Sequence, residues 1–109
     1  MDSILTSIKK LMGIDEEYDA FDKDLIIHIN SVLMILTQLG VGTPYFTING
    51  SGETWDDFMG GDARIESVKT YVYQKVRMIF DPPTSGTHVQ ALEKSINEFE
   101  WRLELAANN

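Results

Sequence analysis

The segment from Leu25 to Leu39 constrains the fold of this 109-residue chain more than any other part of the sequence. Apolar residues recur in it at spacings of three and four, which is the period of an α-helix. The stripe consists of Leu25, Ile29, Val32, Leu36 and Leu39, and it is widened by Ile26, Ile27, Leu33, Met34 and Ile35. A helix with so wide an apolar surface must lie at the centre of a bundle or under another subunit. It is too short to cross a bilayer and is interrupted by polar residues such as His28 and Asn30.

Three further segments show the same helical period. The four helices are expected to begin at Asp2 or Ser3, at Asp22 or Asp24, at Asp62, and at Gly86 or Thr87. Short polar side chains at such positions accept hydrogen bonds from the free amides of a first turn. Met12, Gly40 and the Pro82-Pro83 pair mark the ends of the first three helices, and Thr54 with Asp57 predicts a short extra turn. The predicted fold class is therefore all-α: one domain over residues 1–109, built as a bundle of about four helices.

A β-hairpin is predicted between the second and third helices. Residues that favour strands flank Asn49-Gly50 in the segment from Val41 to Trp55, and Asn-Gly is a strong signal for a hairpin turn. Only about four residues are available on each side, and an isolated two-stranded ribbon is marginal in water. We therefore expect this arm to flex or to pair with a neighbouring chain.

Charge and composition exclude several classes of function. Nine Lys and Arg against seventeen Asp and Glu give a net charge of −8, which argues against broad binding of nucleic-acid phosphates. Without cysteine the chain has no disulfide and no thiolate metal site, and its two histidines are far apart in the sequence. The N-terminus lacks the features of a secretory signal, so we expect a cytoplasmic protein.

Four patterns that could carry chemistry have simpler structural explanations. They are the alternating acids Asp15, Glu17 and Asp19, the loop Gly50-Ser51-Gly52, the adjacent pair Asp56 and Asp57, and His28. The acids lack the glycine and the final glutamate of a calcium loop, and the glycines lack the strand-to-helix context of a phosphate loop. Neighbouring carboxylates on a helix diverge, and no triad partner lies near His28 in the sequence. We therefore assign no catalytic, metal or cofactor residue, and we expect no enzyme.

The helix that follows Asp62 is the one locally basic element. It carries Arg64, Lys69, Lys75 and Arg77, together with Tyr71 and Tyr73. Such a face could line a path for DNA, with the tyrosine rings stacking on bases. The acidic net charge favours an ordinary solvated face instead, with the tyrosines at the edge of the core or in an interface.

The last helix carries apolar residues beyond its core stripe. The stripe consists of Val89, Leu92, Ile96, Phe99 and Leu103, and Trp101 and Leu105 fall outside it. Large aromatic residues commonly anchor interfaces, so these two side chains could contact a partner. Simple packing in the core remains the other interpretation.

The order of several short motifs resembles the small head-tail connector proteins of long-tailed bacteriophages and prophages, those of Gram-positive bacteria most closely. The motifs are Asp15-Glu16-Glu17-Tyr18-Asp19-Ala20-Phe21-Asp22, Ile29-Asn30-Ser31-Val32, Leu36-Thr37-Gln38-Leu39-Gly40-Val41-Gly42, Thr54-Trp55-Asp56-Asp57-Phe58, Val68-Lys69-Thr70-Tyr71, Phe80-Asp81-Pro82-Pro83 and Phe99-Glu100-Trp101-Arg102-Leu103. None of them is a catalytic signature, and together they span nearly the whole chain.

The resemblance implies a structural protein of the virion neck, assembled in the host cytoplasm and without cofactor or membrane contact. In such a protein a ring of about twelve copies joins the portal to a tail-side stopper or neck protein. The ring completes the head and extends the channel through which DNA passes without sequence-specific binding. Acids that face such a channel would repel the phosphates of the DNA.

Two contact sites follow as hypotheses. Tyr45, Phe46 and Ile48 of the hairpin arm are expected to reach a neighbouring subunit, because the arm alone has no core to cover it. Trp101, Arg102, Leu103 and Leu105 are expected to contact the portal, together with the tail Ala106-Ala107-Asn108-Asn109. The alternative function is an acidic regulatory or inhibitory protein, such as a DNA mimic, that binds a basic partner as a monomer or dimer.

Overall fold

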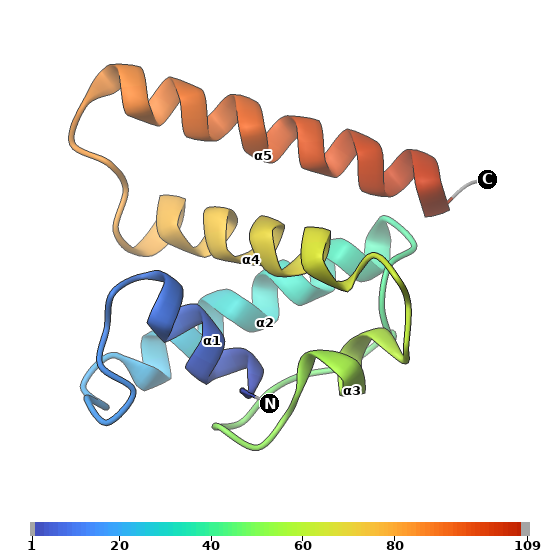
Figure 1. Ribbon diagram of the computed structural model, residues 1–109, viewed down its shortest axis with the longest axis horizontal. Coiled ribbons are helices and arrows are strands. Elements are labelled where there is room, and N and C mark those ends of the chain that lie inside the picture. The colour runs from blue at the N-terminus through green and yellow to red at the C-terminus, as the bar shows by residue number, and fades with distance from the viewer. Residues whose placement is uncertain (1, 108–109) are drawn as a thin grey trace.

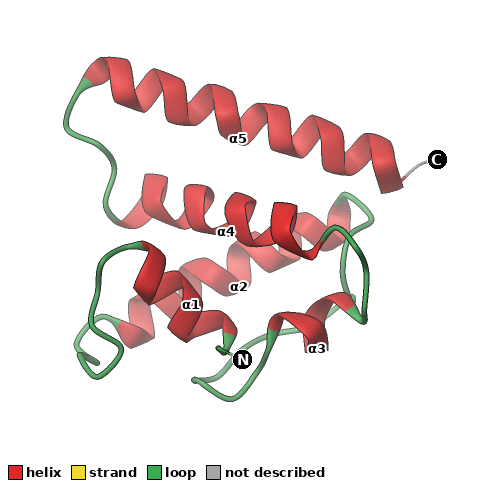
Figure 2. Cartoon of the chain, in the orientation of Figure 1, coloured by secondary structure: helices red, strands yellow, loops and turns green. Residues whose placement is uncertain are grey.

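The chain folds into helices joined by loops (Figures 1 and 2). The structure is a computed structural model that describes residues 2–107. The helices are α1 (Ile4–Leu11), α2 (Asp22–Gln38), α3 (Trp55–Met59), α4 (Ile65–Phe80) and α5 (Gly86–Ala107). Within the described residues there is no strand, and only an isolated bridge links Ser3 to Thr54. The all-α prediction is therefore confirmed, with α3 as a fifth, short helix.

Helices α2 and α4 pack against each other at the centre of the bundle (Figure 1). The buried residues of α2 are Leu25, Ile29, Val32, Leu33 and Leu36. They meet Val68, Tyr71, Val72 and Val76 of α4 in one core. The central position predicted for the apolar helix is confirmed, although Ile27 and Met34 remain exposed on its outer face.

The predicted hairpin between α2 and α3 is wrong. Residues 41–54, which we call the strap, form an irregular segment that leads from the end of α2 to α3. The side chain of Asn30 on α2 donates to the carbonyl of Ile48 (3.0 Å) and accepts from its amide (2.8 Å), as a neighbouring strand would. Ile48 is fully buried. The β-forming residues of the strap therefore pair with a helix side chain and cover the core instead of pairing with each other.

A buried lysine holds the loop between α1 and α2 in place. Lys9 is 2% exposed, and its Nζ lies 2.9 Å from Asp22 Oδ1 and 2.9 Å from the carbonyl oxygen of Glu16. Asp22 therefore does not act as the predicted N-cap of α2. Helix α2 begins after Phe21 without a side-chain cap, because its first carboxylate neutralises the lysine.

The N-terminal caps predicted for α1 and α3 are present in the structure. Ser3 Oγ accepts from the amide of Thr6 (3.1 Å), and Thr54 and Asp57 form the expected capping box. Helix α4 is an exception, since Asp62 accepts from the amide and guanidinium of Arg64 and the helix starts only at Ile65.

Replacing Asn30 by alanine should loosen the strap. The change leaves the buried amide and carbonyl of Ile48 without their partner, so we expect a loss of about 2 kcal/mol in the free energy of unfolding, measured by urea titration. Asn97→Ala, at an exposed position of α5, is the matched control and should change the free energy by less than about 0.5 kcal/mol. Equal effects of the two variants would contradict the role given to Asn30.

The buried ion pair predicts an asymmetry between its two partners. Asp22→Ala leaves the buried Lys9 ammonium without its carboxylate and should cost roughly 3 kcal/mol of unfolding free energy. Lys9→Met keeps the volume and removes the charge, leaving the partly exposed Asp22 and the carbonyl of the exposed Glu16 without their partner, and should cost less than about 1.5 kcal/mol. Thermal unfolding monitored by circular dichroism measures both, with Asp24→Ala as the exposed control. A larger loss for Lys9→Met than for Asp22→Ala would contradict this interpretation.

Candidate interaction surfaces

The strap presents a tyrosine on a tight turn. The amide of Phe46 donates to the carbonyl of Thr43 (3.3 Å), which closes a β-turn with Pro44 at its second position and Tyr45 at its third. Tyr45 has φ +65 and is 100% exposed. Turns with a positive φ at the third position normally carry Gly or Asn there, because a Cβ strains this conformation. Proline at the second position is the sequence signal for the turn, whereas nothing in the sequence marks Tyr45 as strained.

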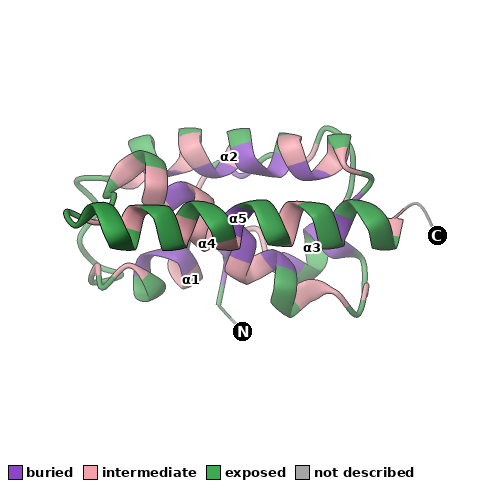
Figure 3. Ribbon diagram, turned by 90° about the horizontal axis from the view of Figure 1, so that it is seen from above, coloured by how far each residue is buried: buried purple, intermediate pink, exposed green. Residues whose placement is uncertain are grey.

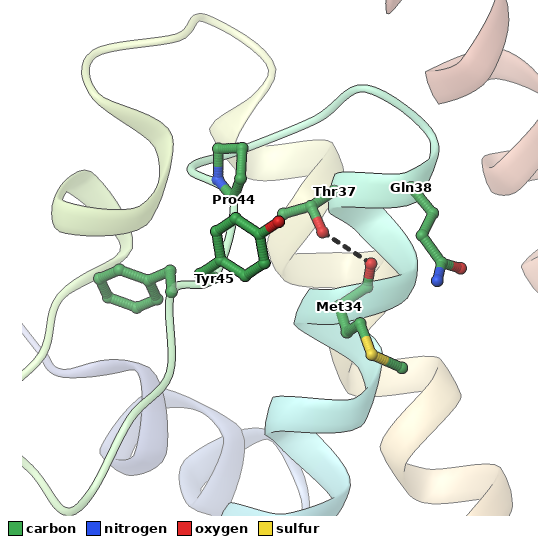
Figure 4. A pocket seen from close by; sticks show the side chains of 6 residues that line it. Met34, Thr37, Gln38, Pro44 and Tyr45 are labelled. Atoms are coloured by element: carbon green, nitrogen blue, oxygen red, sulfur yellow. Dashed lines mark hydrogen bonds between the residues drawn. The ribbon is translucent and has the colours of Figure 1, made fainter.

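A groove of about 450 Å³ separates this turn from the C-terminal half of α2 (Figure 4). It is lined by Met34, Thr37, Gln38, Pro44, Tyr45 and Phe46. The lining carries no charged side chain, and the Thr37 hydroxyl donates to the carbonyl of Met34 (2.8 Å). We call this hollow the strap groove. It is shaped for an apolar side chain and not for an ion.

The three residues predicted to form an inter-subunit arm have different environments. Ile48 lies in this chain's own core, and Phe46 is half-buried with its ring 5.4 Å from that of Phe58. Phe58 also fills the space where a Cβ of Gly42 would stand, so the strap needs glycine at that position. The expectation that the arm lacks a core of its own is therefore wrong. Tyr45 is the member of the set whose side chain is free to meet another molecule.

Helix α5 has a second exposed apolar surface. Its inner side is buried through Ile96 and Leu103 against α4, while the rest of the helix is largely solvent-exposed (Figure 3). Trp101 and Leu105 are 63% and 48% exposed. They lie one helical turn apart on the outer face, opposite the buried stripe. The interpretation of these two residues as core packing is therefore wrong.

The four residues predicted to contact the portal also have different environments. Leu103 is only 3% exposed, so its side chain belongs to the core. Arg102 is exposed and pairs with Glu98 at 2.6 Å, one turn away on the same helix. The surface that α5 offers to a partner consists of Trp101 and Leu105 with this ion pair at its edge.

A polar cluster ties α5 to α4. The buried Tyr71 hydroxyl donates to Glu100 Oε1 (2.8 Å), and Lys75 Nζ lies 3.2 Å from the same oxygen. Burial, and the hydrogen bond to the Glu100 carboxylate, raise the pKa of Tyr71 far above its ordinary value. Tyr71 is fully buried and cannot stack on a DNA base, which excludes that interpretation for this residue.

The basic residues of α4, and Arg64, which precedes it, are largely paired within the chain. Arg64 lies 2.6 Å from Asp62, Lys69 lies 3.2 Å from Glu66, and Lys75 meets Glu100. The hydrogen bonds from Arg64 lower the pKa of Asp62 to about 2. Arg77 donates to the hydroxyl of Tyr73 (3.3 Å). Most positive charge on this helix is therefore matched by a nearby carboxylate, as expected for a mixed-charge outer face.

The patterns considered for chemistry occupy structural positions. Asp57 accepts from the amide of Thr54 in the capping box of α3, and the ring of His28 lies 6.4 Å from that of Phe80. In residues 2–107 no three His, Cys, Asp or Glu side chains are grouped so that they could hold a metal ion. Nor does any helix in this range have the length and apolarity needed to span a membrane.

These features describe an all-α protein whose exposed aromatic and aliphatic side chains are candidate contact points for other macromolecules. The family model described as "Phage connector protein" matches residues 4–109. The chain therefore belongs to the phage connector protein family. No curated protein and no solved structure matches it.

Family membership settles the broad function. Phage connector proteins are structural components of the virion and not enzymes, and the family implies a role in joining head and tail. The prediction that the chain is no enzyme is confirmed by this membership.

The polar cluster predicts an alkaline loss of stability. Above a pH of about 10 a tyrosine in the unfolded chain ionises, whereas the folded Tyr71 keeps its proton. The unfolded state then binds fewer protons, so the free energy of unfolding should fall by about 1.4 kcal/mol per pH unit from this residue. Tyr71→Phe should cost about 1 kcal/mol at pH 8 and should regain stability relative to wild type above pH 10. Urea unfolding at pH 8, 10 and 11 measures the difference, and a pH-independent difference would contradict the assignment.

Proposed function

We propose that the chain, as a single domain over residues 1–109, is a head-tail connector subunit of the phage neck. About twelve copies form a ring between the portal and a tail-side stopper or neck protein, as a cyclic oligomer of one repeated contact. The ring completes the head and extends the DNA channel. The host is a Gram-positive bacterium, because the sequence motifs quoted above resemble those of connectors from such phages and prophages. The subunits assemble in the host cytoplasm.

The observation that carries this proposal is the outer face of α5. Trp101 and Leu105 form an apolar pair on a helix whose opposite side already serves the core. Trp101 is more than half exposed and Leu105 about half, the pair faces away from the core of the single chain, and large aromatics in such positions are typical anchors of protein interfaces. Within a connector family the portal is the partner we assign to this face.

The strap supplies the contact between neighbouring copies. Of the proposed arm residues Tyr45, Phe46 and Ile48, the exposed ring of Tyr45 makes the contact, while Phe46 and Ile48 hold the strap on its own bundle. In support of these roles, the carbonyl of Ile48 accepts a hydrogen bond from Asn30 and its amide donates one to Asn30. The contact between copies is therefore a rigid projection and not a flexible ribbon.

Charge makes the proposed ring compatible with DNA passage. The chain has eight more acidic than basic residues, and many of its exposed acids lie in the loop between α1 and α2. Repeated around a ring, a net negative field repels phosphates and disfavours adhesion of the DNA. The same net charge supports no sequence-specific recognition of bases.

Portal binding through α5 can be tested on the folded chain. Trp101→Ser with Leu105→Ser should weaken binding to the portal protein of the same phage at least tenfold, measured by light scattering after size exclusion. The unfolding free energy should change by less than about 0.5 kcal/mol, because both residues are exposed. Truncation after Arg102 is a weaker test, since it also removes the buried Leu103. The proposed role of Asn108 and Asn109 lies outside the described residues.

Ile27→Ser is the matched control, because Ile27 is as exposed as Trp101 but lies on the outer face of α2. This variant should bind the portal as the wild type does. A wild-type chain that remains a monomer and ignores the portal at high concentration would refute the connector function. That outcome would favour an acidic regulator, and binding to basic proteins would then be measured.

A further inference from the structure

A second hollow lies between α4 and α5. This α4–α5 groove has a volume of about 310 Å³ and is lined by Lys75, Met78, Ile79, Glu93, Ile96 and Asn97. The lining includes the apolar side chains Met78, Ile79 and Ile96, and Ile79 is half-exposed. It also includes the polar side chains Lys75, Glu93 and Asn97. An apolar ring that carries one hydroxyl group suits this combination, because the ring can meet the apolar residues and the hydroxyl the polar ones.

Tyr45 has the shape and the chemistry for such a groove. Its side chain projects fully into solvent from a turn whose positive φ strains any residue with a Cβ. Within its own chain the phenol ring forms one wall of the strap groove (Figure 4). Within residues 2–107 the Tyr45 hydroxyl makes no hydrogen bond that holds the strap. A fixed backbone that presents a large exposed ring resembles the rigid anchors that dominate protein interfaces.

The projection and the groove lie at different ends of one molecule. The strap leaves α2 at the end of the bundle where α4 begins (Figure 1). The α4–α5 groove is formed by the C-terminal half of α4 and the N-terminal half of α5, toward the other end (Figures 1 and 3). A contact between these two surfaces therefore joins two copies head to tail and cannot be satisfied within one chain. Contacts of this heterologous kind generate closed rings when the rotation between copies closes.

From this arrangement we propose that Tyr45 of each copy inserts into the α4–α5 groove of the next copy. The ring packs on Met78, Ile79 and Ile96, including a sulfur–aromatic contact with Met78. The hydroxyl donates to the carboxylate of Glu93 or to the side-chain oxygen of Asn97. This inference rests on the proposed ring and names the surface that receives the Tyr45 projection.

The area of the contact indicates when it forms. One tyrosine buries roughly 150–250 Å². A stable complex of two proteins needs about 800 Å² per partner, so this contact alone cannot hold a dimer in dilute solution. It becomes effective when a template such as the portal holds neighbouring copies side by side and raises their effective concentration. We therefore expect free chains to be monomers and the contact to appear on the portal.

Cysteine crosslinking locates the contact, since the chain itself has no cysteine. Tyr45→Cys and Ile79→Cys chains are mixed on the portal and treated with a short thiol-specific crosslinker. Covalent dimers between the two variants should exceed tenfold those from either variant alone. Leu11→Cys replaces Ile79→Cys in the control, because both residues are half-exposed and Leu11 lies on α1, outside the α4–α5 groove.

A substitution gives a second, independent readout. Tyr45→Asn removes the ring and suits the positive φ, since Asn tolerates this conformation better than other residues. The fold should persist by circular dichroism, while the number of copies bound per portal falls at least tenfold at subsaturating concentration. Tyr18→Asn, at another exposed tyrosine, should assemble as the wild type does.

The outcomes separate this inference from the proposed function. Assembly of the wild type on the portal with crosslinks between positions 45 and 79 supports both. Normal assembly with equal crosslinking to position 11, or with dimers of Tyr45→Cys alone, overturns the inference and leaves the connector function standing. Failure of the wild type to bind the portal overturns the connector function and this inference together.

Discussion

The pair of hydrogen bonds between Asn30 and the backbone of Ile48 is the interaction on which the strap and its candidate contact surface depend. It holds an irregular segment against the central helix and satisfies a buried amide and carbonyl that would otherwise cost free energy. Because Ile48 is fixed in the core, the turn before it projects outward with Tyr45 at its tip. A single polar side chain on α2 thereby converts a loop into a rigid wall for the strap groove and a rigid support for an exposed aromatic ring.

Helix α5 is joined to the molecule through one side only. Two buried residues, Ile96 and Leu103, and the cluster of Tyr71, Lys75 and Glu100 attach it to α4. The apolar contacts supply area, while the buried hydroxyl fixes the register of the two helices, because a displaced α5 would leave it without an acceptor. The outer face of α5 does not pack against the core, so it can carry Trp101 and Leu105 without affecting the fold.

Helical periodicity predicted α1, α2, α4 and α5 because their buried faces are long and regular enough to dominate local preference. It could not predict that Asn30 would pair with Ile48, since that bond joins residues distant in the sequence and competes with the Asn49-Gly50 turn signal. Lys9 was unforeseen for the same reason: its burial depends on Asp22 across the connector. The exposed pair on α5 was visible in the sequence, because Trp101 and Leu105 break the stripe. The separation of Leu103 from them required the structure.

The exposed apolar surface of this protein lies in pieces on several elements, such as Tyr45 at the strap groove and Trp101 with Leu105 on α5, and this distribution suits a connector. One large apolar patch would favour association of free chains, whereas small pieces are tolerated on soluble monomers. Each piece alone is too small to sustain a complex. Several pieces engaged at once on a template gain from effective concentration, so their combined affinity far exceeds that of any single contact. A connector built in this way remains unassembled until a portal arranges its copies, and the strain at Tyr45 is the structural cost of holding one such anchor ready.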